Sequence, residues 1–326
     1  MKGAWVFAFF LAVSAAFSWP TVTFDPDVLV TRHFDLFPAV WVLDGPSGSA
    51  WPVGETLARV DSYVLLALGW LLPLGGKTIA GLLAWVGPAL GAWAAERCAR
   101  VAFGVLRPWS LVAGLMYGFS GITATALLEG HVHHVLDPWL PLLLEAAWTM
   151  HRGGWQRGVL ASVWWALALY TTAYAGVLGA VLLAVGVLRG GVLKLLPGFV
   201  LVALPAGLAY LHLFHSGGRW GDGAPPQPEL VWRMGAATLG GVAGWSDAYD
   251  IGHHSISAPA GWMGLCLVGA APIALRGTRN WRTVWVLGLA SLVLSLGRNT
   301  ALGEWLVGLP GTHWFRFPVR FSWLWA

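Results

Sequence analysis

A chain of 326 residues that is 57% hydrophobic and only 10% charged has the composition of a membrane protein, because soluble domains contain about 25% charged residues. The net charge of +4 is too small to indicate a nucleic-acid partner. The two cysteines lie in apolar runs without CxxC or His/Cys spacing, which argues against redox chemistry. No P-loop, GxGxxG, GxSxG or HExxH motif occurs, which argues against a nucleotide-driven pump.

The N-terminal apolar run, Ala4–Trp19, follows Lys2 and is expected to be an uncleaved membrane anchor, because many further apolar runs follow it. The alternative is a secretory signal with small residues around Ala15 and Ala16, and either interpretation sends the segment after it to the outer face. The next segment, 20–77, is predicted to be an outer loop. It interleaves acids with Gly, Pro and Trp, a pattern typical of a folded, turn-rich loop. Its acids are Asp25, Asp27, Asp35, Asp44, Glu55 and Asp61.

The run Ser62–Leu74 is apolar but short and is ended by Gly75 and Gly76, so it is predicted to be an interfacial helix. The longer apolar runs after it are predicted to cross the membrane. They are roughly 78–96, 109–127, 136–150, 159–174, 176–188, 195–213, 259–275 and 283–297. With the first helix this makes nine spans, and Phe321–Ala326 would begin a tenth.

Charge in the connections supports this topology. Eleven of the 19 basic residues fall on one side, which the positive-inside rule assigns to the cytoplasm, whereas 13 of the 15 acids fall on the other. The basic residues of the inner side are Lys2, Arg97, Arg100, Arg107, Arg152, Arg157, Arg189, Lys194, Arg276, Arg279 and Arg282. The outer side then collects 20–77, a short loop at 129–137, a long loop at 214–258 and the segment from 298 to 326. A long Gly/Pro-rich loop such as 214–258 usually marks a lid or binding loop.

Two carboxylates of the first outer loop are candidate catalytic residues. Asp35 lies in HFDLFP, among aromatic residues at the expected membrane surface. Desolvation there raises a carboxyl pKa or requires a cationic or metal partner. Asp61 lies in ARVDSY, at the start of the interfacial helix, where an N-cap role is the alternative.

Nine of the ten histidines lie on the predicted outer side, and two clusters, EGHVHH (Glu129–His134) and DIGHH (Asp250–His254), space them closely. We predict that His131 and His134 bind substrate. Glu129 and His131 are candidate ligands of a divalent cation such as Mg, Mn or Zn. The alternative is that these histidines only form hydrogen bonds at the membrane interface.

Arg316 and Arg320 are four residues apart around Pro318 in HWFRFPVRFSW, on the side where short loops carry few basic residues. Guanidinium geometry matches phosphate, so we predict that the pair binds a phosphate-bearing substrate. The alternative is that both side chains reach lipid headgroups from the bilayer edge.

Four segments, in order, resemble the GT-C class of polytopic glycosyltransferases, and more closely the bacterial polyprenyl-phosphate mannosyltransferases and oligosaccharyltransferases. The first is the loop with Asp35 and its continuation WPVGETLARVDSYVLLALGWLLP. The others are GAWAAERCARVAFGVLRPWSLVAGLMYGFSG, EGHVHHVLDPWLPLLLEAAW and LPGTHWFRFPVRFSWL. The resemblance spans nearly the whole chain.

The resemblance implies an all-α polytopic membrane protein, a GT-C-like bundle formed by residues 1–326 as one transmembrane domain. It implies an inverting transferase in the bacterial inner membrane, active outside the cytoplasm. Asp35 would deprotonate an acceptor hydroxyl, and a polyprenyl-phosphate-linked sugar would be the donor, with membrane lipids as the surroundings. One alternative is a transporter or flippase of a lipid-linked or anionic solute. Another is an inactive scaffold, because the chain ends where a tenth helix is expected to begin.

Overall fold

The computed structural model describes residues 3–19, 36–44, 62–128 and 130–217, together with residues 250, 251, 254, 255, 301 and 305. The chain forms two units, Met1–Phe119 with Ala126–Arg219, and Ser120–Thr125 with Trp220–Ala326. In the second unit, part of the DIGHH cluster forms an antiparallel hairpin of β1 (Asp250–Ile251) and β2 (His254–Ser255). The predicted spans 259–275 and 283–297 and the start of a tenth helix lie outside the described residues.

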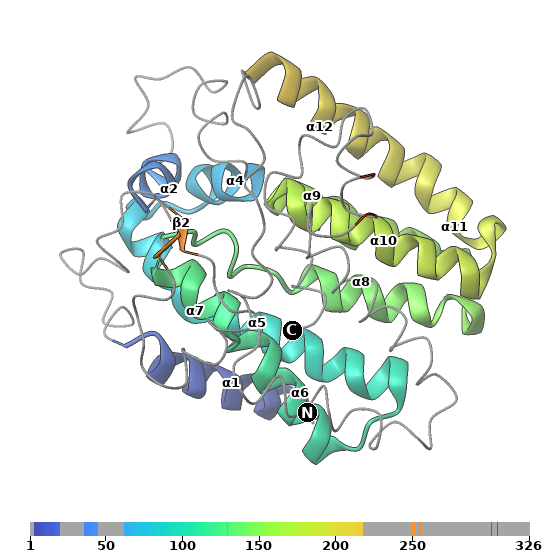
Figure 1. The fold of residues 1–326 in the computed structure, drawn as a ribbon, viewed down its shortest axis with the longest axis horizontal. Helices are drawn as coiled ribbons and strands as arrows, with labels where there is room; N and C mark the ends of the chain where they lie inside the picture. The colour runs from blue at the N-terminus through green and yellow to red at the C-terminus, as the bar shows by residue number, and fades with distance from the viewer. Residues whose placement is uncertain are drawn as a thin grey trace. The chain divides into compact units, whose positions relative to one another are not determined.

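Apart from that hairpin, the regular elements of the described residues are helices (Figure 1). They are α1 (Ala4–Phe17), α2 (Leu36–Leu43), α4 (Tyr63–Leu71), α5 (Gly76–Phe103), α6 (Arg107–Gly118), α7 (Gly121–Leu128), α8 (Trp139–Trp148), η3 (Met150–Arg152), α9 (Trp155–Thr171), α10 (Ala173–Gly190), α11 (Val192–Gly198), η4 (Phe199–Ala203) and α12 (Leu204–Gly217). The predicted helical fold class is confirmed at this level. Two helical stretches, Gly76–Phe103 and Val192–Leu211, are long and apolar enough to cross a membrane.

Two predictions about the helices need correction. The single span predicted at 109–127 is divided, because α6 ends at Gly118 and a new helix begins at Gly121. Ser120 starts that helix, since its Oγ accepts a hydrogen bond from the Thr123 amide at 3.3 Å. The cap suggested for Asp61 belongs instead to Ser62, whose Oγ accepts from the Leu65 amide at 3.4 Å.

The predicted shortness of the helix after Ser62 is confirmed. Nine residues of α4 rise about 14 Å, half of the hydrocarbon thickness of a bilayer. Its orientation along the membrane interface stays a prediction. The short connection implied by the predicted spans 159–174 and 176–188 is also present, since Thr172 is the only non-helical residue between α9 and α10.

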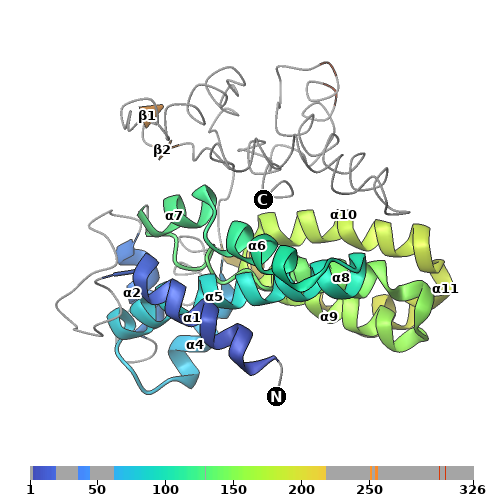
Figure 2. The same ribbon diagram turned by 90° about the horizontal axis from the view of Figure 1, so that it is seen from below.

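Helix α5 is the centre of the first unit, and α1, α2, α6 and α8 pack against it (Figure 2). Glycines permit the close approach of α6. A Cβ atom added at Gly114 would lie 2.6 Å from the carbonyl oxygen of Ala92, and one added at Gly118 would meet the Pro88 carbonyl. Small residues four apart at a helix interface are a common packing device of membrane helices.

Pro88 inside α5 explains how α1 docks. Proline has no amide hydrogen, so the carbonyl of Ala84, one turn earlier, loses its helical donor. The Ser18 hydroxyl at the end of α1 donates to that carbonyl at 2.6 Å, and the Trp85 indole donates to the Leu11 carbonyl at 2.9 Å. Hydrogen bonds therefore fix α1 on the turn of α5 that precedes Pro88.

Charged side chains gather where three connections meet, α5 to α6, α8 to α9 and α10 to α11; we call this region the basic end. Arg97 forms two hydrogen bonds to Glu145, at 2.7 and 3.0 Å, and Arg157 Nη1 lies 3.8 Å from the same carboxylate. Arg189 donates to the Trp148 carbonyl at 3.2 Å, and Lys194 to the carbonyl of Met150 at 3.3 Å. These contacts join the three described connections that the charge pattern assigned to one side.

Candidate functional site

The loop between α7 and α8, Gly130–Pro138, carries the predicted histidines and is hereafter the histidine loop. Gly130 has φ of +80°, a left-handed conformation that favours glycine. The following turn is closed by a hydrogen bond from the His134 amide to the His131 carbonyl at 2.9 Å. Val132, Val135 and Leu136 are buried, so the backbone of the loop is held by its apolar side chains.

Three imidazoles of this loop lie against one another. The rings of His131 and His134 are stacked, with centroids 5.1 Å apart and an interplanar angle of 17°. The His133 ring meets that of His134 edge-on at 4.2 Å. His133 is buried, whereas His131 and His134 are half-buried. The loop thus presents imidazole nitrogens, which donate, accept and transfer protons near neutral pH.

The described residues do not form a metal site. No group of three His, Cys, Asp or Glu side chains among them is arranged to hold an ion. His131 and His134 stack face to face and do not converge with a third ligand. Glu129 lies outside the described residues, so the predicted pairing of Glu129 with His131 stays a prediction.

Asp137, at the end of the histidine loop, is a candidate that the sequence reasoning missed. The Tyr117 hydroxyl on α6 donates to the Asp137 carbonyl at 3.0 Å and lies 3.3 Å from its Oδ2. Its Oδ1 is buried and has no hydrogen-bond partner among the described residues. Burial raises the pKa of Asp137 to about 7, and hydrogen bonds from the Leu140 amide and Tyr117 offset this only in part.

A carboxyl group with a pKa near 7 can both release and take up a proton at neutral pH, as a general acid or base must. The sequence offered only a weak signal for this role. Asp137 precedes Pro138, and an Asp–Pro pair ordinarily marks a turn. Its hydrogen-bond partner Tyr117 lies on α6, 20 residues earlier in the chain.

One apolar cluster joins the histidine loop to the first outer loop. Val132 and Leu136 of the histidine loop pack with Ala39, Val42 and Leu43 of α2. The same cluster contains residues of α4 and of the first two turns of α5, namely Leu65, Ile79, Ala80 and Leu83. Helix α2 begins at Leu36, directly after Asp35, so the segment that follows the predicted catalytic carboxylate shares an apolar core with Val132 and Leu136 of the histidine loop.

The end of the predicted first outer loop is also anchored, at the C-terminal end of α9 and at the middle of α12. Tyr63, next to the α4 cap, lies with its ring 5.6 Å from that of Tyr170 and 5.5 Å from that of Tyr210. Tyr170 in turn donates its hydroxyl hydrogen to the Ala206 carbonyl at 3.1 Å. Residues just after Asp61 are therefore placed by aromatic packing.

Of the predicted site residues, the structure places His131 and His134 together in the histidine loop. Asp35, Asp61, Glu129, Arg316 and Arg320 lie outside the described residues. Comparison of the chain with family models, with curated proteins and with solved structures gave no significant match.

Proposed function

We propose that this chain is an integral membrane glycosyltransferase, which transfers a sugar from a polyprenyl-phosphate donor to an acceptor hydroxyl at the outer face of the membrane. The observation that carries the proposal is the shared apolar cluster of α2 and the histidine loop. It joins the segment after Asp35 to a loop that holds three histidines and a carboxyl group with a pKa of about 7. The order of motifs that resembles the GT-C class supplies the reaction.

A position within the bilayer is supported by the surface of α11, η4 and α12. Large apolar side chains along this stretch are exposed, including Leu193 at 83%, Leu201 at 69% and Leu208 at 59%. A continuous apolar stripe of this size is unfavourable in water and is the surface expected of a helix that faces lipid. The opposite side of the stretch packs on α9.

The distribution of charge supports an enzyme that acts at one face over a transporter. Among the described residues of the first unit, every Asp, Glu, Lys and Arg lies in a connection or within two turns of a helix end. A transporter places ionisable groups near the bilayer midplane. The basic end is assigned to the cytoplasm. Arg97 lies 18 residues after Ile79 in α5, a rise of about 27 Å, which separates the basic end from the cluster that supports the site.

In the proposed reaction, the acceptor oxygen attacks the anomeric carbon and forms the new glycosidic bond. The bond from that carbon to the phosphate oxygen breaks, and the polyprenyl phosphate leaves with the electron pair. Asp35 takes the proton of the acceptor hydroxyl. His131 and His134 form hydrogen bonds to the sugar or phosphate, and Arg316 and Arg320 bind the donor phosphate.

The test is transfer of a labelled sugar from a polyprenyl-phosphate donor by the full chain reconstituted in vesicles. Asp35→Asn keeps the shape and removes the base, so transfer should fall by about 10²–10⁴-fold. Asp27→Asn is the matched control and should retain most of the activity, because Asp27 lies in the sequence FDPD, where Asp next to Pro predicts a turn. Loss of transfer in Asp61→Asn together with full transfer in Asp35→Asn would move the base to Asp61. If the wild-type chain shows no transfer with donors of several sugars, the proposal is wrong.

A further inference from the structure

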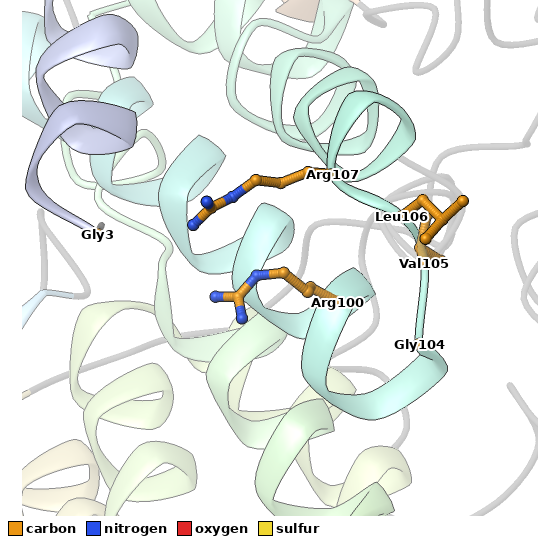
Figure 3. Close-up of a pocket in the computed structure, with 6 residues that line it drawn as sticks. All are labelled: Gly3, Arg100, Gly104, Val105, Leu106 and Arg107. Atoms are coloured by element: carbon orange, nitrogen blue, oxygen red, sulfur yellow. The ribbon is translucent and has the colours of Figure 1, made fainter.

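The carboxyl group of Asp137 differs from the other buried carboxyl groups in the described part of the first unit, because no cation accompanies it. Glu96 accepts a hydrogen bond from Arg100 Nε at 3.2 Å, and Figure 3 shows that guanidinium beside the turn from α5 to α6. Glu145 binds Arg97. Within the described residues, no arginine or lysine forms an ion pair with Asp137. A buried carboxyl group without a cation favours its neutral form.

The hydrogen bonds around Asp137 also favour a neutral carboxylic acid. Tyr117 Oη lies 3.0 Å from the main-chain carbonyl oxygen of Asp137 and 3.3 Å from its Oδ2. A tyrosine hydroxyl has a single hydrogen, and the shorter distance assigns it to the carbonyl oxygen, which can only accept. A neutral carboxyl group can then donate its own hydrogen from Oδ2 to Tyr117 Oη. Both contacts are satisfied when Asp137 is protonated.

Ionisation of Asp137 is unfavourable in this arrangement. Its Oδ2 would compete with the main-chain carbonyl for the hydrogen of Tyr117, and its buried Oδ1 has no hydrogen-bond partner among the described residues. A buried charge without donors costs more than a buried neutral group. Burial raises the pKa of Asp137 to about 7, although a hydrogen bond from the Leu140 amide lowers it. The ionised form therefore favours a conformation in which the carboxylate reaches water.

Asp137 lies between two points at which the chain is fixed on other helices. Before it, the Val135 carbonyl packs on α5, because a Cβ atom added at Gly87 would lie 2.8 Å from that oxygen. After it, Trp139 Nε1 donates to Thr171 Oγ1 on α9 at 2.9 Å. The contact with α6 joins the segment between these two points to a third helix, so its loss would release that segment.

Other titratable groups lie near Asp137 and have to be separated from it. On α6 there is the phenol of Tyr117, and on α5 the buried thiol of Cys98 lies near that phenol. Phenols and thiols ordinarily ionise above about pH 8. The histidine loop itself contributes the imidazoles of His131, His133 and His134. Imidazoles change charge near neutral pH, so an experiment has to distinguish their titration from that of the carboxyl group.

We infer that Asp137 and Tyr117 form a proton-controlled latch, in which neutral Asp137 donates to Tyr117 and holds the histidine loop on α6, and ionisation of Asp137 releases the loop. The latch is closed below neutral pH and opens as the pH rises. Opening gives the imidazoles of the loop more access to solvent. The latch is a property of the loop, so it does not depend on the proposed transferase reaction.

Proton linkage gives the size of the effect. The pKa of Asp137 is about 7 in the latched loop, and its ordinary value of 3.8 applies once the carboxyl group is released. The released form therefore loses its proton first, and the equilibrium constant for opening rises with pH between these values. It should increase by about 50-fold from pH 5 to pH 7, but only by about twofold from pH 7 to pH 8.

Hydrogen–deuterium exchange of the full chain in lipid nanodiscs measures this opening, once each rate is divided by the rate of an unstructured chain at the same pH. The reporters are the amides of the histidine loop, such as that of His134, which donates to the His131 carbonyl at 2.9 Å. Helix α8 is the internal reference. Asp137→Asn is the first variant, because its amide group can donate to Tyr117 at every pH and the histidines are unchanged.

In Asp137→Asn, opening of the loop should change by less than about threefold from pH 5 to pH 7. Tyr117→Phe should increase opening at pH 5 by about 3- to 10-fold, because one hydrogen bond is lost. Tyr170→Phe is the matched control, since that hydroxyl donates to the Ala206 carbonyl, and it should change opening by less than about twofold.

Three results would overturn the inference. The first is a wild-type loop whose opening does not rise with pH, or rises equally in α8. The second is the same rise in Asp137→Asn, which would assign it to the histidines. The third is unchanged opening at pH 5 in Tyr117→Phe, a result that can be obtained even if Asp137→Asn does not fold.

Discussion

The pair Arg97 and Glu145 offers the most quantitative test of the basic end. Glu145 has a side chain only 4% exposed, whereas that of Arg97 is 42% exposed. Removing Arg97 therefore leaves a buried charge behind, whereas removing Glu145 leaves a charge that is partly exposed to solvent. Arg97→Met leaves a buried carboxylate whose nearest cation is Arg157 at 3.8 Å, and should lower the free energy of unfolding by about 3–5 kcal/mol.

Glu145→Gln should have a smaller effect, about 1–2 kcal/mol, because the half-exposed arginine can regain water and the amide oxygen still accepts one hydrogen bond. In the double variant no buried charge is left unpaired. The decrease in the free energy of unfolding of the double variant should therefore be smaller than the sum of the two single decreases, by about 2 kcal/mol.

Unfolding of the purified chain in mixed micelles, titrated with a denaturing detergent, measures all three differences. Arg152→Met is the matched control, since it removes an exposed arginine at the same end, whose described hydrogen bond is to neighbouring His151. It should change stability by less than about 0.5 kcal/mol. If the losses of Arg97→Met and Glu145→Gln add within about 0.5 kcal/mol, the two side chains are not coupled and the reasoning fails.

Three further predictions test packing, ionisation and topology. Gly198→Leu should disrupt the contact of α11 with α9 and lower thermal stability, because a Cβ at position 198 would lie 2.7 Å from Ser162 Oγ. Gly154→Ala is the control and should leave thermal stability unchanged, because a Cβ at position 154 would have no atom within 4 Å. Asp137→Asn should flatten the pH dependence of stability. A carboxyl pKa raised from 3.8 to about 7 makes the folded chain bind the proton more tightly, so wild-type stability should fall as pH rises between these values. An unchanged pH profile would contradict that pKa. A membrane-impermeant maleimide should label Ser47→Cys in intact cells but Gly154→Cys only after permeabilisation, and the reverse pattern would invert the topology.

The sequence by itself predicted where most of the described helices lie. Apolar runs of sufficient length must be helical in lipid, because only a helix satisfies its own backbone hydrogen bonds there. The end of the apolar run at Gly75–Gly76 could be predicted because two glycines interrupt it. The clustering of basic residues also predicted which connections belong together, and contacts from Arg97 to Glu145 and from Lys194 to Met150 join them.

The candidate site was predicted less completely. His131 and His134 were recognised because three histidines in four residues are conspicuous, and their rings do stack. Asp137 was overlooked, because an Asp–Pro pair is an ordinary turn signal. The break at Phe119–Ser120 was missed because the residues on both sides of it are apolar.

Tertiary structure decided what each polar group contacts. Pro88 leaves the Ala84 carbonyl, in the same helix, without a helical donor. The hydroxyl that donates to this carbonyl belongs to Ser18, 66 residues earlier in the chain. The pKa of Asp137 is raised by burial in the folded chain, and Glu145 is neutralised by an arginine 48 residues earlier. Helix formation depends on neighbours within about one turn, so sequence predicts it. Desolvation and charge pairing depend on which segments pack together, so only the folded chain decides them.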